Sequence, residues 1–229
     1  PAEAFGTYVA GSAYAPALAG MDISSGQPDI RVSLDKRALK GNKVQVLERD
    51  TTVVVPTGPF PVQNSATGKT NSFYQNANLY LCLNDENGKG VWGVPFKQPI
   101  CGYVESIDYY ANGKVQFLFA AGSGLYLIDR LGRFVGGFPV DLGKPVLLGP
   151  KVYDFTGAKG YTVMVLHQDN SLEMYNLHGQ KPASWKGIYA PETVKALPEL
   201  LEVKDKKYWV VRTSIRTLVY GVDGGDPLT

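Results

Sequence analysis

The sequence has few of the residues that build metal and nucleophile sites. It contains two histidines, two cysteines and three methionines among 229 residues. Cys82 and Cys101 lie 19 positions apart, and neither has a second cysteine or a histidine at the spacing of a zinc-ligand pair. A zinc knuckle is therefore excluded. We expect two buried thiols, and the alternative is a disulfide, which would indicate an oxidising compartment.

A charge excess of one sign and long apolar runs are also missing. Lysines and arginines number 23 and aspartates and glutamates 21, so the formal net charge is +2. A nucleic-acid-binding face usually needs a strong basic excess, and a membrane-spanning helix needs about 20 consecutive apolar residues. The longest apolar runs, such as 117–121 and 162–166, have the length of a strand. We expect no nucleic-acid partner and no membrane insertion by this segment.

The sequence is rich in turn formers and aromatic residues, with 26 glycines, 15 prolines and 14 tyrosines. One pattern recurs: an apolar strand, a turn with Asp or Asn three residues before a glycine, and then an aromatic residue. The glycines of the three clear copies are Gly88, Gly132 and Gly179, spaced by 44 and 47 positions, and a weaker copy ends at Gly224. We call the four residues that end at each of these glycines a glycine turn. Asp, Asn and Gly tolerate the positive φ angles that such turns require.

A second motif repeats between the glycine turns. Asp108 and Asp154 lie 46 positions apart, and each follows an apolar strand and precedes a glycine and a lysine. The repeating unit therefore contains four strands within about 45 residues, which is typical of a propeller blade. A single blade cannot cover both of its apolar faces, so blades occur in stacked arrays. We predict an all-β fold, namely a β-propeller or partial propeller of roughly five four-stranded blades.

The repeat also gives predicted domain boundaries. We assign residues 60–229 to blades at about 60–100, 101–145, 146–190 and 191–229, and residues 1–59 to N-terminal strands and loops or to a first blade. Within residues 1–59, alternation predicts a strand over 29–34 and a hairpin over 44–55. Proline cannot donate to a sheet ladder. The steps Phe60-Pro61, Phe138-Pro139 and Val94-Pro95-Phe96 are therefore expected at crossings between blades.

The stretch Asp85-Glu86-Asn87-Gly88-Lys89-Gly90-Val91-Trp92 resembles the repeat of quinoprotein-like (PQQ-like) β-propellers. Residues 137–140, Gly-Phe-Pro-Val, are similar to repeats of uncharacterised bacterial cell-envelope propeller proteins. The resemblance covers roughly residues 60 to 225. It implies a scaffold or binding role and no quinone cofactor, because the chain lacks the vicinal cysteine pair of the quinoprotein enzymes. We expect an extracytoplasmic location, no metal and no other cofactor. Because the sequence starts at Pro1, we expect a longer parent protein.

Carboxylates are the remaining candidates for catalysis. Asp108, Asp154 and Glu202 occupy related positions in three successive copies of the repeat. Some propellers host glycosidases whose paired acidic groups face the central channel. A repeated acid more often caps a turn by accepting hydrogen bonds from backbone amides. His167 and His178 both fall in predicted hairpin turns, where we expect solvated side chains.

The aromatic residues near the predicted strand ends favour the hypothesis of a binding surface. Aromatic side chains at a propeller opening can stack on sugars or anchor a peptide. The candidate binding residues are Asp108, Tyr109, Tyr110, Asp154, Trp209 and Arg212. We predict a noncatalytic binding or scaffold module with a protein or glycan ligand. The alternatives are a carbohydrate-active hydrolase that uses channel carboxylates and a purely structural domain of a longer chain.

Overall fold

The computed structural model divides the chain into two units, Pro1–Arg49 and Asp50–Thr229. It describes the backbone of residues 18–22, 29–33 and 52–228, and the side chains of residues 52–228. In the first unit, β1 (Leu18–Asp22) and β2 (Asp29–Ser33) form an antiparallel hairpin. The strand predicted over 29–34 is therefore present as β2. Of the hairpin predicted over 44–55, residues 44–51 lie outside the described residues, and 52–55 have no regular secondary structure.

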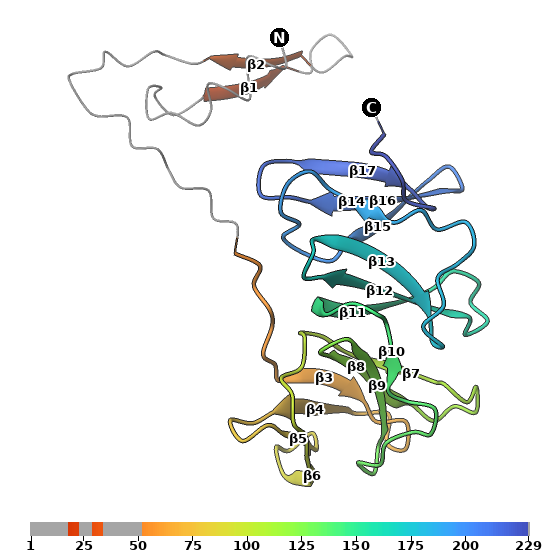
Figure 1. Cartoon of the computed structure of the whole chain (residues 1–229). Helices are drawn as coiled ribbons and strands as arrows, with labels where there is room; N and C mark the ends of the chain where they lie inside the picture. The colour runs from red at the N-terminus through yellow and green to blue at the C-terminus, as the bar shows by residue number, and fades with distance from the viewer. Residues whose placement is uncertain (1–17, 23–28, 34–51, 229) are drawn as a thin grey trace, which may run out of the picture. The chain divides into compact units, whose positions relative to one another are not determined.

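The second unit contains four antiparallel sheets that follow one another along the chain (Figure 1). We call them blades 1 to 4. Blade 1 consists of β3 (Phe60–Gln63), β4 (Thr70–Gln75), β5 (Tyr80–Asn84) and β6 (Gly90–Pro95). Blade 2 consists of β7 (Val104–Ile107), β8 (Gln116–Ala121), β9 (Gly124–Asp129) and β10 (Val140–Asp141). Blade 3 consists of β11 (Val146–Asp154), β12 (Tyr161–His167), β13 (Ser171–Asn176) and β14 (Ile188–Tyr189). Blade 4 consists of β15 (Glu199–Val203), β16 (Lys206–Arg212) and β17 (Thr217–Gly221).

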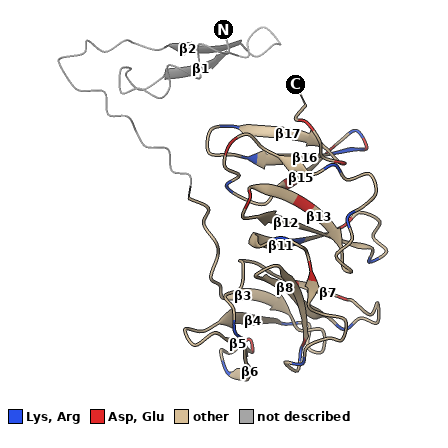
Figure 2. Cartoon of the chain, viewed as in Figure 1, with Lys and Arg blue, Asp and Glu red and all other residues tan. Residues whose placement is uncertain are grey.

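These sheets confirm the predicted fold class. The described residues form strands and turns without a helix, and each sheet is a meander of three or four antiparallel strands, as in a propeller of several blades. No helix among the described residues is long and apolar enough to span a membrane. Charged residues of both signs are scattered over all four blades (Figure 2).

The three glycine turns that begin with Asp85, Asp129 and Asn176 share one hydrogen-bonding scheme. Asp85 Oδ1 accepts hydrogen bonds from the backbone N–H groups of Asn87 (2.9 Å) and Lys89 (2.8 Å). Asp129 and Asn176 make the same pair of bonds in blades 2 and 3. The φ of Gly88 is 80°, a value that favours glycine. Local turn chemistry thus explains the repeat seen in the sequence.

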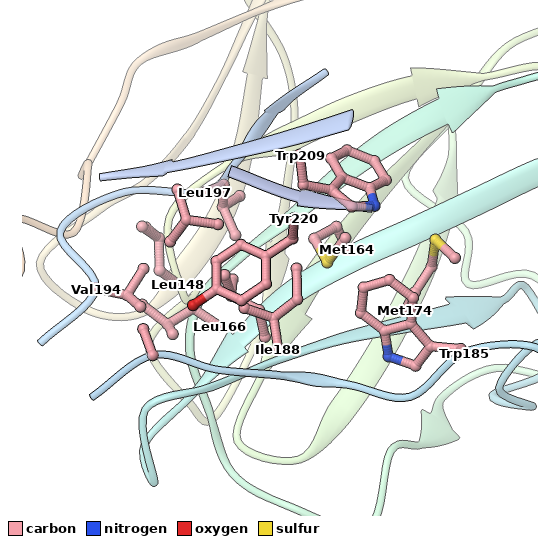
Figure 3. Close-up of a cluster of buried hydrophobic side chains, with 13 residues drawn as sticks. Leu148, Met164, Leu166, Met174, Trp185, Ile188, Val194, Leu197, Trp209 and Tyr220 are labelled. Carbon is pink, nitrogen blue, oxygen red and sulfur yellow. The ribbon is translucent and has the colours of Figure 1, made fainter. Parts of the chain in front are cut away.

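Each pair of neighbouring blades encloses one apolar core, so the four blades have three such cores among the described residues. Figure 3 shows the core between blades 3 and 4, where Trp209 and Tyr220 of blade 4 lie close to Met164, Leu166 and Ile188 of blade 3. All five side chains are buried. The array is therefore held together blade by blade.

The glycine turns that end at Gly132, Gly179 and Gly224 reinforce these cores, because each lies against the preceding blade. A Cβ at Gly132 would lie 3.1 Å from Trp92 Cδ2 of blade 1, and Trp92 Nε1 donates to the carbonyl of Arg130 at 3.0 Å. A Cβ at Gly179 would lie 2.5 Å from Val140 Cγ1 of blade 2. A Cβ at Gly224 would lie 2.5 Å from the carbonyl oxygen of Gly187, the residue before β14 of blade 3. We call a glycine turn in this position a seated turn.

Candidate functional site

Asp108 and Asp154 act as caps of equivalent turns. Asp108 follows β7, and its carboxylate accepts from the backbone N–H groups of Asn112 (3.0 Å) and Gly113 (2.8 Å). Asp154 ends β11 and accepts from the backbone N–H of Lys159 (2.9 Å). The Lys159 ammonium, which bonds to Asp108, and the turn amides hold the pKa of Asp108 below its ordinary value. The hydrogen bond from the backbone N–H of Lys159 likewise lowers the pKa of Asp154.

Tyr109 and Tyr110 continue the turn that Asp108 caps. Their rings meet edge to face with centroids 5.0 Å apart, and Tyr109 also meets Phe138 edge to face at 5.6 Å. Tyr110 is exposed and lines a cavity of about 330 Å³ together with Arg130. The structure thus brings Asp108, Tyr109 and Tyr110 together at one end of blade 2.

The other two candidate binding residues lie in blade 4. Trp209 is fully buried in the core between blades 3 and 4, and its indole N–H donates to the carbonyl of Val222 at 3.0 Å. Arg212 is exposed and pairs with Glu199 at 2.8 Å. Glu199 lines a pocket of about 260 Å³ with Glu105 of β7, Lys151 of β11 and three residues outside the strands, Tyr103, Ala196 and Leu197. Burial raises the pKa of Glu105.

His167 is not the solvated turn residue that the sequence analysis predicts. It ends β12 with no exposed surface, and its ring lies 3.1 Å from the carbonyl of Pro145 and 2.9 Å from the hydroxyl of Tyr175. A carbonyl can only accept, so Nδ1 carries the proton, and Nε2 of the neutral ring can accept from the hydroxyl of Tyr175, which also lies 3.3 Å from the carbonyl of Leu142. His178 is exposed as expected. Both cysteines are free thiols that are partly rather than fully buried.

An aromatic groove lies between the outer parts of blades 1 and 2. It has a volume of about 450 Å³. Its lining comes from the last residue of β6 and the three residues that follow it, from β9, and from the loop that leads into β10. The lining residues are Pro95, Phe96, Lys97, Gln98, Tyr126, Phe134, Phe138 and Pro139. We call these eight residues the aromatic groove.

The rings of the aromatic groove support one another. Phe96 meets Tyr126 edge to face with centroids 5.0 Å apart and stacks on Phe134 at 6.1 Å. Tyr126 stacks on the fully buried Phe119 at 5.4 Å, which fixes the floor of the groove to the core. Phe134 is 43% exposed. Rings held in this way need little ordering when a ligand binds.

Lys97 supplies the only charge among the lining residues of the aromatic groove. It is exposed, and within the described part of the chain it has no carboxylate partner. Gln98 and the hydroxyl of Tyr126 add neutral polar groups. The groove can therefore enclose an apolar side chain and can attract a negative charge at its rim.

This groove could not be predicted from the proline steps when they are interpreted as markers of blade crossings. Val94-Pro95-Phe96 does lie at the end of blade 1, but Phe138-Pro139 lies inside blade 2, between β9 and β10, and Phe60-Pro61 belongs to β3. The steps Pro95-Phe96 and Phe138-Pro139, together with Phe134, were the available signal. Only the packing of blade 1 on blade 2 brings them together.

Among residues 52–228, no group of three or more histidine, cysteine, aspartate or glutamate side chains is placed to hold a metal ion.

No protein-family model matches the chain, and no match was found among curated proteins. Solved structures give matches. BBS1N, in a crystal structure with ARL6DN soaked with mercury, is 12% identical with a TM-score of 0.54 and covers 78% of this chain and 55% of its own. BamB from Moraxella catarrhalis is 13% identical with a TM-score of 0.46 and covers 69% of this chain and 45% of its own. The chain thus spans about half the length of these proteins. The likeness to BBS1N supports the propeller-type fold.

Proposed function

We propose that this chain is a noncatalytic binding module that holds an extended segment of a partner protein in the aromatic groove. The observation that carries the proposal is the cavity of about 450 Å³ in which Phe96, Tyr126, Phe134 and Phe138 converge from two blades. Concave sites lined by aromatic rings dominate the energetics of protein recognition when they enclose an anchoring side chain. The partner segment therefore carries an apolar or aromatic anchor.

The charge at the rim defines the partner further. Lys97 is exposed beside the apolar lining, so an aspartate or glutamate next to the anchor would gain an attractive contact. A sugar would need several hydrogen-bonding groups around a flat ring. The groove offers the side chains of Lys97 and Gln98 and one tyrosine hydroxyl, which favours a peptide over a glycan.

The hydrolase alternative finds less support. Its predicted carboxylates, Asp108 and Asp154, accept hydrogen bonds from the backbone of their own turns, and the third, Glu202, is exposed in β15. Acids used in this way are turn caps. A propeller-type protein in complex with a protein, BBS1N with ARL6DN, adds support for protein binding as the role of this fold.

We also propose that the chain belongs with the quinoprotein-like propellers of the cell envelope and works outside the cytoplasm. The repeat residues Asp85 to Trp92 and the Gly-Phe-Pro-Val stretch at 137–140 support this. Fractionation of the native cell, followed by antibody detection of the chain, tests the location. Recovery in the cytoplasm alone would overturn it.

The binding proposal is tested with a random peptide library displayed on phage and selected against the immobilised full chain. Enriched peptides are expected to share an apolar or aromatic residue beside an acidic one. Phe134→Ala should weaken their binding about tenfold, because an exposed anchor contact is lost. Leu131→Ala is the matched control, since Leu131 is exposed in the same loop but does not line the groove. Enriched peptides that bind Phe134→Ala as well as the parent chain would overturn the proposal.

A further inference from the structure

Two turns of blade 2 lie side by side and enclose a cavity of about 330 Å³. Gln116, the first residue of β8, pairs with Asp129, the last residue of β9. This register places the turn before β8 and the glycine turn after β9 at the same end of the sheet. The charged residues that line the cavity are Lys114, Asp129, Arg130 and Arg133, and Tyr110 adds an aromatic ring. We call the cavity with these five residues the basic pocket.

The basic pocket carries an excess of positive charge. Asp129 is the only carboxylate among its lining residues, and Arg133 pairs with it through Nε at 2.8 Å and a second guanidinium nitrogen at 2.7 Å. The charges of that pair cancel, which leaves the side chains of Lys114 and Arg130. Both residues are exposed, and neither has a carboxylate partner within the described part of the chain. The pocket therefore offers two positive charges to a ligand.

The counterpart of Lys114 one repeat later is used in packing. Lys159 belongs to the equivalent turn of blade 3, and its ammonium binds Asp108, the residue that follows the first strand of blade 2. The residue that follows the first strand of blade 1 is Asn64, which caps its turn by accepting from the N–H of Ala66 but carries no charge. The equivalent ion pair therefore cannot form for Lys114, and packing of blade 2 on blade 1 does not account for its charge.

Hydrogen bonds fix the backbone that carries both cations. The N–H of Lys114 donates to Oδ1 of Asn112 at 3.1 Å, and its carbonyl accepts from Nε2 of Gln116 at 2.8 Å. The carbonyl of Arg130 accepts from Nε1 of Trp92 at 3.0 Å, which ties this turn to blade 1. Charged groups on a fixed backbone lose less freedom when a ligand binds.

Tyr110 adds a flat surface beside these charges. It is 57% exposed, and its ring is held edge to face against Tyr109. An aromatic ligand can pack on such a ring. A cavity of about 330 Å³ is at the small end of the range for ligand sites, which is about 300–1,000 Å³, so it suits one ring with its substituent.

We propose that the basic pocket binds an aryl phosphate, that is, a phosphate monoester carried by an aromatic ring. A phosphate monoester has a charge of about −1.5 to −2 at neutral pH, which matches the charges of Lys114 and Arg130. A carboxylate or a sulfate ester carries only one negative charge. The guanidinium of Arg130 also presents paired N–H donors that match two phosphate oxygens. The site is separate from the proposed function, because no residue lines both the basic pocket and the aromatic groove.

The test is isothermal titration calorimetry of the full chain with phenyl phosphate at low ionic strength. We expect phenyl phosphate to bind more tightly than phenyl sulfate, which has less negative charge, and than inorganic phosphate, which lacks the ring. A short phosphotyrosine peptide is titrated beside it, because the same group occurs on proteins and on small molecules. Whichever of the two binds more tightly identifies the source of the ligand, and either order supports the site.

Four variants locate the binding. Lys114→Met and Arg130→Met should each weaken phenyl phosphate about tenfold, because each removes a charge-assisted hydrogen bond. Tyr110→Leu should weaken phenyl phosphate and leave inorganic phosphate unchanged, because only the ring contact is lost. Lys89→Met is the matched control: Lys89 is exposed, follows Gly88 as Arg133 follows Gly132, and lies outside the basic pocket. It removes one positive charge and should leave the affinity unchanged.

Urea denaturation of the four variants shows that they are folded. Phenyl phosphate that does not bind the parent chain would overturn the proposal. So would a parent affinity that both Lys114→Met and Arg130→Met retain, or a loss in Lys89→Met as large as theirs. Phenyl sulfate that binds as tightly as phenyl phosphate would overturn the assignment to a doubly charged group.

Discussion

The ammonium of Lys159 in blade 3 binds the carboxylate of Asp108 in blade 2. The backbone N–H of the same lysine bonds to Asp154, the counterpart of Asp108 one repeat later. A second polar contact lies beside it, because the backbone N–H of Asp108 donates to the hydroxyl of Tyr161 at 3.1 Å. One end of the contact between blades 2 and 3 is therefore polar and depends on pH.

Lys159→Met is expected to lower the denaturation midpoint of the chain at neutral pH. The pKa of Asp108 is lowered, so its contribution is present above its ordinary pKa of 3.8 and is lost as pH falls through its folded value. The pKa of Lys159 is raised by Asp108, so that contribution is present below 10.5 and is lost as pH rises through its folded value. In urea titrations, the difference in denaturation midpoint between Lys159→Met and the parent chain should shrink both at low pH and at high pH. Lys114→Met, an exposed lysine of the turn that Asp108 caps, should show no such dependence.

The seated turns can be tested at Gly132. Gly113 and Gly132 both have a φ of 80°, but only Gly132 lies against another blade. Gly113→Ala should cost about 1 kcal/mol in the free energy of unfolding, because alanine is strained at positive φ. Gly132→Ala should cost about 1 kcal/mol more, because its Cβ crowds Trp92 and Val94. Equal losses in chemical denaturation would show that the turn does not press on blade 1.

The buried pair of His167 and Tyr175 gives a further prediction. Tyr175→Phe removes the donor to Nε2 of a fully buried ring and should cost about 1–3 kcal/mol in the free energy of unfolding. Burial lowers the pKa of His167, so its contribution is present above the ordinary histidine pKa of 6.5 and is lost as pH falls through its folded value. Stability of the parent chain should therefore decline below pH 6.5. His178→Gln should keep this decline, and His167→Gln should remove it.

Lys97→Glu tests the charge at the rim of the aromatic groove. Binding of acidic peptides selected on the parent chain should fall about tenfold, because attraction becomes repulsion. Added salt should weaken the parent's binding and strengthen that of the variant, as screening acts on exposed charges. Lys186 is an exposed lysine outside the groove, so Lys186→Glu should leave the peptide affinity and its salt dependence unchanged. Fluorescence polarisation measures both quantities. If the selected peptides bind Lys97→Glu as tightly as the parent chain, the ligand does not contact the rim of the groove at Lys97.

The blades could be predicted from the sequence because their turns are determined locally. Asp85, Asp129 and Asn176 each bond to the backbone of the next few residues, so the same residue types recur wherever the same turn is needed. The use of Asp108 and Asp154 as caps follows from the same local chemistry. Such features do not depend on what packs around them.

Features that arise between repeats could not be predicted in this way. Trp209 was a candidate for binding, but blade 3 covers it, and alternation along β16 does not reveal which face a neighbour covers. His167 follows an apolar strand like a turn residue, and only Pro145 and Tyr175 explain its burial. The aromatic groove likewise combines residues about 40 positions apart, such as Phe96 and Phe134.

Because the aromatic groove takes its walls from two separate sheets, its shape exists only while blade 1 is docked on blade 2. A ligand that fills it therefore also opposes the opening of that joint, and by reciprocity whatever loosens the joint releases the ligand. The fraction of chains that carry ligand and the local order of blade 1 are then governed by the same equilibrium. Amide exchange in β4 and β5 should slow in proportion to the fraction of chains that carry ligand.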